Sequence, residues 1–387
     1  MPPEHSEAYE YIDTDESLER LSERVRRADR IALDTEGNSL HNYFEKVCLI
    51  QVGVEGDQYI VDPLSGVNLN AFFDALSSTQ LIFHAADYDL RILRASHDFV
   101  PKTGVFDTML AAQLLGYDEL GLAQVVYRHF EVKLAKGGQK SNWTRRPLSD
   151  GQLTYAADDT RFLDDLCDRL RDELAEKDRL EWHRQACQRM VDGAMNHARP
   201  DSDEVWRIRG MGTRSPRELN CIREIWRWRD AEARRIDRPP FRIMGNKGVL
   251  SLAEWAVSRS NEDAGDGLED RKEIPKRIAS GQLARLKHAV QRADGMPEEE
   301  WPGPRKKTGP QRISSDEKHR VDRLSVARAR IAQEMEIEPS VIAPRAALES
   351  IVRAQAESAE EILACSTLLP CQAALLEPLI DSMRRNQ

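Results

Sequence analysis

Near the N-terminus, segments whose hydrophobic positions have the spacing of a strand stand beside segments whose hydrophobic positions have the spacing of a helix. The apolar run at 31–33 predicts a buried strand, and three further strand-like runs begin at Val47, Gln58 and Leu81. The segment 17–27, ahead of the first strand, has the apolar spacing of a helix. Strands followed by helices predict an α/β sheet flanked by helices.

Helical spacing continues after the fourth strand. Helices are expected at 88–97, 107–116, 122–130 and, as one long helix, from about Leu153 to Leu174. Strand signals disappear from about residue 200, where two similar helical units occupy 226–255 and 323–352. In each unit an Arg- and Ala-rich helix leads to an acid, a proline, a hydrophobic pair and a second helix. This self-similarity favours duplicated domains over short repeats.

The length of 387 residues exceeds what one ordinary core organises, so several domains are expected. The stretch 294–316 contains four prolines with Gly, Ser and charged residues, which predicts a flexible basic linker. We therefore expect an α/β domain at 1–195, a helical domain at 200–293, this linker, and a second helical domain at 317–387.

The net charge of −10 argues against a polyanionic partner, because phosphate binding relies on Lys and Arg. Residues 205–245 are an exception, with eleven Arg against five acids and with Trp206, Trp226 and Trp228 among them. Such a stretch favours local contact with a polyanion, although a solvated helix face is the commoner explanation.

Cysteine usage and hydropathy bear on the compartment. The six cysteines form no C-x-x-C pair, so the sequence supports neither a zinc ribbon nor a disulfide framework. The first thirty residues lack the apolar core of a signal peptide, and no run of 18 apolar residues occurs. We expect a cytoplasmic protein that is neither secreted nor membrane-spanning.

Three short acidic segments stand at positions that favour chemistry. Asp34 and Glu36 end the first strand and, being two residues apart, face the same side of it. Asp89 lies in H-A-A-D-Y-D, at the junction of the fourth strand and a helix. Tyr155 and Asp159 lie four residues apart and therefore share one helix face.

If the three segments converge, the four carboxylates would share one pocket and raise one another's pKa. Two divalent cations would neutralise such a cluster, and carboxylates without nearby His or Cys favour magnesium or manganese over zinc. Two metals form a known clamp for in-line displacement at phosphorus, and a nearby phenol can orient the attacking water. Taken singly, each acid is more often a surface carboxylate. The direction and spacing of Asp87 and Asp158 predict that these two acids do not belong to the cluster.

The acidic segments resemble the three exonuclease motifs of the DEDD superfamily, in the subclass whose third motif contains tyrosine. The stretch W-T-R-R-P-L at 143–148 resembles the W-x-x-R-P-L of that family, and the two helical units are similar to HRDC domains. The chain as a whole resembles the ribonuclease D family, in which tandem HRDC domains follow the nuclease. The matching residues, in motif order, are Asp34 and Glu36; His84, Tyr88 and Asp89; and Tyr155 and Asp159.

The resemblance implies a ribonuclease H-like exonuclease domain, a mixed sheet with flanking helices, followed by two all-α HRDC bundles. It implies hydrolysis of RNA from the 3′ end by a two-metal mechanism, using Mg²⁺ or Mn²⁺ and releasing 5′-mononucleotides. Asp34, Glu36 and Asp159 then hold the metal that activates water, and Asp34 and Asp89 help to hold the second. Tyr155 orients or deprotonates the water. Precursors of tRNA and other small structured RNAs are the expected substrates.

Further substrate contacts are weaker candidates, and other functions stay open. His84, Trp226 and Arg227 are candidate substrate-binding residues, each with an ordinary structural role as its alternative. A DNA 3′-5′ exonuclease is one alternative function, because such enzymes use the same carboxylates and only contacts to the 2′-hydroxyl distinguish RNA from DNA. A noncatalytic nucleic-acid-binding protein is another. The absence of G-x-x-x-x-G-K argues against a nucleotide triphosphate as partner. We expect no membrane partner and a monomer.

Overall fold

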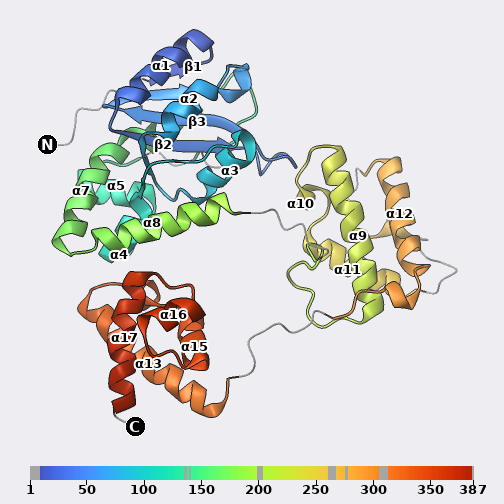
Figure 1. Ribbon diagram of the computed structural model, residues 1–387. Coiled ribbons are helices and arrows are strands. Elements are labelled where there is room, and N and C mark those ends of the chain that lie inside the picture. The colour runs from blue at the N-terminus through green and yellow to red at the C-terminus, as the bar shows by residue number, and fades with distance from the viewer. Residues whose placement is uncertain are drawn as a thin grey trace. The chain divides into compact units, whose positions relative to one another are not determined.

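The computed structural model (Figure 1) describes two compact units. The first combines the described parts of 1–37, 46–197 and 310–387, and the second those of 38–45 and 198–309. Part of the predicted linker, 305–312, lies outside the described residues. The described residues are 9–134, 137–138, 141–197, 204–259, 267–274, 278–304 and 313–385.

A mixed six-stranded sheet organises the N-terminal part of the first unit. Across the sheet the order is β1-β4-β3-β2-β5-β6. Strand β3 runs antiparallel to β2 and β4, whereas the pairs β1–β4, β2–β5 and β5–β6 are parallel. The four predicted strands are present, and the short strands β1 and β6, which the pattern did not predict, form the two edges. The strands are β1 (Tyr9–Ile12), β2 (Arg30–Gly37), β3 (Val47–Val54), β4 (Asp57–Val61), β5 (Gln80–Phe83) and β6 (Val105–Asp107).

Helices cover both faces of this sheet. Helices α1, α2 and α3 pack on one face, where Leu21, Phe72 and Leu90 join a common core. Helices α4, α5 and α7 pack on the other face, together with Ala32 and Ile82 of the sheet. The helices are α1 (Asp15–Arg27), α2 (Asn70–Ser77), α3 (Asp87–His97), α4 (Thr108–Leu115), α5 (Leu122–Phe130), α6 (Asp150–Arg161), α7 (Leu163–Glu176) and α8 (Leu180–Met195).

The single long helix predicted over 153–174 is wrong, because two helices occupy this stretch. Helices α6 and α7 meet at Phe162, whose backbone (φ −103°, ψ −3°) interrupts the helix. Ala156 and Ala157 of α6 pack with β3 and β4, whereas Leu166 of α7 packs with α4 and α5. The break allows consecutive segments to cover two different parts of the sheet.

A second helical bundle completes the first unit and packs against its N-terminal part. Arg179, which precedes α8, donates to the carbonyl oxygens of Leu114 at 2.7 Å and Met335 at 2.5 Å. Lys177 pairs with Glu336 at 3.0 Å. The turn between α7 and α8 therefore contacts both the bundle and α4. Its helices are α13 (Ser315–Glu334), α14 (Pro339–Ile342), α15 (Arg345–Ala354), α16 (Ala359–Cys365) and α17 (Pro370–Arg385).

The second unit is helical in its described residues. Trp206, Trp228, Leu252 and Leu286 belong to its core. Its long helix α9 is followed by the four-residue α10 and then α11, and the same order recurs in α13, α14 and α15. This recurrence accounts for the sequence similarity between the two helical units. The helices are α9 (Pro216–Arg235), α10 (Pro240–Ile243), α11 (Asn246–Val257) and α12 (Ser280–Asp294).

Within the described ranges, no single helix has the length and apolar character needed to cross a bilayer. The segments Ala359–Cys365 and Pro370–Met383 meet that requirement only as a pair, which is bent by 118°.

Candidate active site

The acidic pair of β2 projects from the sheet face that α6 covers. Ile31 and Leu33 belong to the core under α1 to α3, whereas Ala32 belongs to the core on the opposite face. Because side chains alternate along a strand, Asp34 and Glu36 point to the same side as Ala32. Helix α6 packs against β2, β3 and β4.

Asp159 of α6 meets this acidic pair. One carboxylate oxygen each of Asp34, Glu36 and Asp159 lies within 4.8 Å of the other two. The start of α6 is fixed by a capping box, in which Ser149 and Gln152 satisfy each other's backbone N–H groups. The structure thus brings the end of β2 and the middle of α6 to one point.

Asp89 lies beside this three-carboxylate group and is held by β2. Its Oδ1 accepts hydrogen bonds from the Thr35 backbone N–H at 3.0 Å and from the Thr35 hydroxyl at 2.6 Å. Thr35 alternates with the two acids, so it faces α3, from which Asp89 comes. Both residues are 6% exposed. Burial, followed by the charges of Asp89 and Asp159, raises the pKa of Asp34 well above its usual range.

All four carboxylates have raised pKa values, and burial is the leading cause in each. Burial, followed by the charges of Asp159 and Asp89, raises the pKa of Glu36 to about 9. Burial raises the pKa of Asp89 and that of Asp159 to about 7. Hard oxygen ligands that disfavour one another's charge fit a divalent cation such as magnesium.

Tyr155 lies one helical turn before Asp159, at the edge of the cluster. Its phenol is hydrogen-bonded to Asp159. Burial, followed by the charges of Asp159 and Glu36, raises the pKa of the phenol above its usual range. A protonated hydroxyl is therefore held beside a carboxylate of the group.

The turn from β5 into α3 is held by Asp107. Ala85 in this turn has φ +67°, which non-glycine residues adopt infrequently. The Asp107 carboxylate accepts the N–H groups of Ala85 at 3.2 Å and Ala86 at 2.8 Å, and it also caps α4. His84 is anchored in the same turn, with Nδ1 2.9 Å from the Thr108 hydroxyl oxygen.

Two acids near the motifs pair with arginines, and two supporting residues were not predicted. Asp87 and Asp158 each pair with an arginine of their own helix, at 2.6 and 3.0 Å. Thr35 and Asp107 hold parts of the site but escaped the sequence reasoning. An aspartate directly before a helix is a recognisable cap signal for Asp107. The contact of Thr35 with Asp89 depends on packing between β2 and α3.

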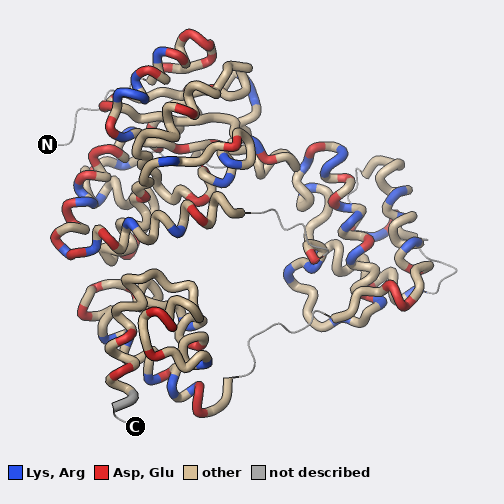
Figure 2. The backbone as a smooth tube through the Cα atoms, viewed as in Figure 1, with Lys and Arg blue, Asp and Glu red and all other residues tan. Residues whose placement is uncertain are grey.

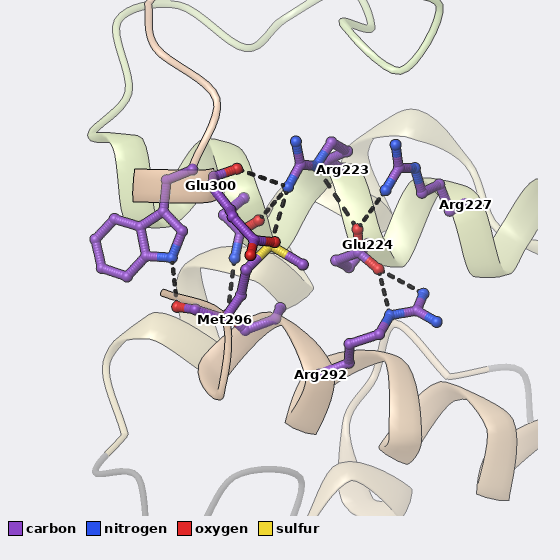
Figure 3. Close-up of polar contacts among 9 residues, drawn as sticks. Arg223, Glu224, Arg227, Arg292, Met296 and Glu300 are labelled. Atoms are coloured by element: carbon purple, nitrogen blue, oxygen red, sulfur yellow. Dashed lines mark hydrogen bonds and ion pairs between the residues drawn. The ribbon is translucent and has the colours of Figure 1, made fainter. Parts of the chain in front are cut away.

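The remaining candidates, Trp226 and Arg227, lie on α9 in the second unit. Trp226 is half-buried and packs against the core of that unit. Arg227 is exposed, and its Nη1 lies 2.9 Å from Oε1 of Glu224, which is 1% exposed. Arg292 of α12 donates to the other oxygen of Glu224 at 2.6 Å, as Figure 3 shows. One buried carboxylate therefore holds arginines from two helices.

A groove of about 630 Å³ between α9 and α12 includes these arginines in its lining. Arg285 also lines it and pairs with Glu232, which is 2% exposed. Basic and acidic residues are interspersed along these helices (Figure 2), but both glutamates are buried while the arginines reach the surface. The groove therefore presents guanidinium groups to solvent.

Comparison with known proteins first defines the class. The 3′-5′ exonuclease family model matches residues 9–175, which contain the whole carboxylate cluster, and the HRDC domain model matches residues 218–262. The chain therefore contains a 3′-5′ exonuclease domain and one HRDC domain.

Individual relatives then narrow this class. Ribonuclease D of Gluconacetobacter diazotrophicus is 29% identical over 338 residues, 86% of this chain and 83% of that protein. Ribonuclease D of Xanthomonas oryzae pv. oryzae is 33% identical over 244 residues, 61% of this chain and 66% of that protein. The chain is thus a homologue of ribonuclease D, and its enzyme class is that of the 3′-5′ exoribonucleases.

Solved structures share the fold. A protein from Bifidobacterium adolescentis superposes with a TM-score of 0.83 at 21% identity, over 98% of this chain and 97% of that chain. Escherichia coli RNase D, described as an exoribonuclease involved in structured RNA processing, superposes with a TM-score of 0.68 at 22% identity. That match covers 89% of this chain and 90% of that chain. The mixed sheet with flanking helices, followed by a helical region, is confirmed.

Proposed function

We propose that this 3′-5′ exoribonuclease shortens RNA by a two-metal mechanism that releases 5′-mononucleotides. The observation that carries the proposal is the meeting of Asp34, Glu36 and Asp159 within 4.8 Å, with Asp89 held beside them. Two cations held by such a cluster would form the clamp that in-line displacement at a phosphodiester bond requires.

The carboxylates divide between two sites. Asp34, Glu36 and Asp159 would hold one divalent ion, and Asp34 and Asp89 would help to hold the other. When bound, the ions neutralise the cluster, lower the pKa of water and stabilise the leaving oxygen. Thr35 keeps Asp89 at its position through two hydrogen bonds to one oxygen. Carboxylate-only ligands support Mg²⁺ or Mn²⁺.

Tyr155 supplies the remaining catalytic group, as in the tyrosine subclass of the superfamily. Its phenol stands beside Asp159 and orients the attacking water. Asp159→Asn should abolish shortening of a 5′-labelled RNA in magnesium, whereas Asp158→Asn should keep it, because Asp158 pairs with Arg161 instead. Equal activity of the two variants would contradict the assignment.

We also propose that the groove between α9 and α12 contacts the RNA backbone through Arg227, with Arg292 beside it. Guanidinium groups held by a buried carboxylate are pre-positioned for phosphate oxygens. Trp226 is a further proposed contact, although its packing against the core favours a structural role. His84 is proposed to face the terminal nucleotide, with Thr108 fixing its ring.

The proposed contact between this groove and RNA predicts a change in KM when Arg227 is replaced. Arg227→Gln leaves Arg292 paired with Glu224, so the bundle should fold normally. We expect KM for RNA to rise about threefold or more at unchanged kcat, with a weaker salt dependence. Arg345→Gln, which removes a similarly exposed arginine from the other bundle, is the matched control and should leave KM unchanged. A KM for Arg227→Gln equal to that of the control would exclude the contact.

The natural substrate and setting complete the proposal. Precursors of tRNA and other small structured RNAs with a free 3′ end are the proposed substrates, and the proposed form is a cytoplasmic monomer. We also propose that the second bundle is a divergent HRDC domain, since α13 to α15 follow the helix order of α9 to α11. A tRNA precursor with a short 3′ trailer, compared with single-stranded DNA of the trailer sequence, tests both substrate and sugar preference. Faster trimming of the DNA would instead favour the DNA exonuclease.

A further inference from the structure

The loop that precedes α6 lies against the ring of Tyr155. Gly138 is buried, and a Cβ atom built on it would stand 2.1 Å from Cδ1 and 2.2 Å from Cγ of Tyr155. Real carbon atoms do not approach so closely. Hydrogen is therefore the only side chain that fits between the backbone at 138 and the tyrosine ring.

The same loop is fastened to the sheet. Arg146 donates to both carboxylate oxygens of Asp62 at 2.6 Å, to the carbonyl oxygen of Cys48 at 2.9 Å and to that of Trp143 at 2.7 Å. Trp143 is 1% exposed and packs with β3 and β4. Trp143 and Arg146 therefore hold their part of the loop against the sheet.

Trp143 adds a second contact to the tyrosine. The rings of Trp143 and Tyr155 lie 6.2 Å apart between centroids at an interplanar angle of 32°. The Gly138 carbonyl oxygen accepts the Ser141 N–H at 2.9 Å, which links Gly138 to the part of the loop that contains Trp143. The loop thus touches Tyr155 at two places while remaining tied to the sheet.

We propose that Gly138 is a positioning residue, whose missing side chain lets the anchored loop set the phenol of Tyr155 beside Asp159. This inference rests on the proposed role of Tyr155 in catalysis. Gly138 has no side chain that could act as a ligand or a reacting group. The loop acts by excluding other orientations of the ring, and a displacement of the phenol by about an ångström is enough to cost about a hundredfold in rate.

Gly138→Ala tests the inference in the full-length protein. The added methyl group must displace either the ring or an anchored loop, so kcat on a 5′-labelled RNA should fall about tenfold or more, with KM within about threefold. Gly151→Ala is the matched control, because Gly151 lies on α6 and a Cβ there meets nothing within 4 Å. The control should retain wild-type kcat and melting temperature.

A double-mutant cycle separates positioning from general damage to the fold. Tyr155→Ala removes the ring with which the new methyl group collides, so Gly138→Ala should change the residual kcat of that variant less than about twofold. A wild-type kcat for Gly138→Ala would overturn the inference. So would a fall in kcat by the same factor in the presence and in the absence of the Tyr155 ring. A wild-type kcat for Tyr155→Phe would instead refute the proposed role of the tyrosine itself, which distinguishes the two failures.

Discussion

Neutralising Asp34 should stabilise the metal-free protein while abolishing its activity. Asp34 has oxygen atoms within 4.8 Å of Glu36 and Asp159, so at an effective dielectric constant of about 20 each charged pair costs about 3.5 kcal/mol. Protonating one acid avoids that repulsion but costs about 1.4 kcal/mol for each pH unit above its ordinary pKa, or about 5 kcal/mol at pH 7.5. Asp34 takes part in two such pairs, which together cost about 7 kcal/mol, so protonating one acid is the smaller cost and sets the scale.

Asp34→Asn should therefore raise the free energy of unfolding of the metal-free protein by about 5 kcal/mol at pH 7.5. For a unit of this size that corresponds to a rise of about 10 to 20 °C in melting temperature. Thermal unfolding in EDTA, followed by circular dichroism, measures the change. Addition of magnesium should stabilise the wild type strongly and the variant much less.

The control for this experiment is Asp87→Asn. Asp87 lies on the first turn of α3 and pairs with Arg91, and its side chain is 55% exposed. Its replacement should change stability by less than about 1 kcal/mol and leave activity intact. An Asp34→Asn protein that melts at or below the wild-type temperature would refute the repulsion argument. Retention of about a tenth of wild-type activity in excess magnesium would refute the ligand role.

Three further results are expected. Thr35→Val removes the hydroxyl that donates to Asp89 at 2.6 Å, so kcat should fall about tenfold. A higher magnesium concentration should restore part of the lost activity. An unchanged dependence of kcat on magnesium would contradict this role of Thr35. Arg146→Met leaves the buried carboxylate of Asp62 without its cation, so the free energy of unfolding measured in urea should fall by about 3 kcal/mol. A fall of less than about 1 kcal/mol would argue that the pair of Arg146 and Asp62 does not hold the loop to the sheet. The carboxylates of the cluster bind protons more tightly in the folded than in the unfolded state, so stability in EDTA should fall as pH rises from about 5 to 8. Saturating magnesium should make stability less dependent on pH. A metal-free protein that gains stability between about pH 5 and 8 would contradict the raised pKa values of the carboxylates.

The sequence was informative where local pattern and tertiary structure agree. The four apolar runs predicted strands, and the structure has a strand at each of them, β2 to β5. The edge strands β1 and β6 have four and three residues, too few for a period to emerge. The interruption at Phe162 carries no glycine or proline signal. It arises because α6 and α7 pack into different cores, which spacing along one helix cannot reveal.

The acidic motifs were visible from the sequence, whereas the residues that hold them were not. Asp34 and Glu36 could be placed on one side of a strand from their separation alone. Thr35 sits between them and appears as an ordinary strand residue until α3 brings Asp89 to its hydroxyl. Gly138 resembles any loop glycine in the sequence. Only the position of Tyr155 in space shows why a side chain does not fit there.

The most direct test of the central claim is a time course on matched 5′-labelled RNA and DNA oligonucleotides with a free 3′-hydroxyl. Wild-type and Asp34→Asn protein would each be assayed in magnesium and in EDTA. The account predicts a ladder of products shortened from the 3′ end on RNA, with release of 5′-mononucleotides, only for the wild type in magnesium. Intact RNA under all conditions despite binding, or an equal ladder from Asp34→Asn, would contradict it.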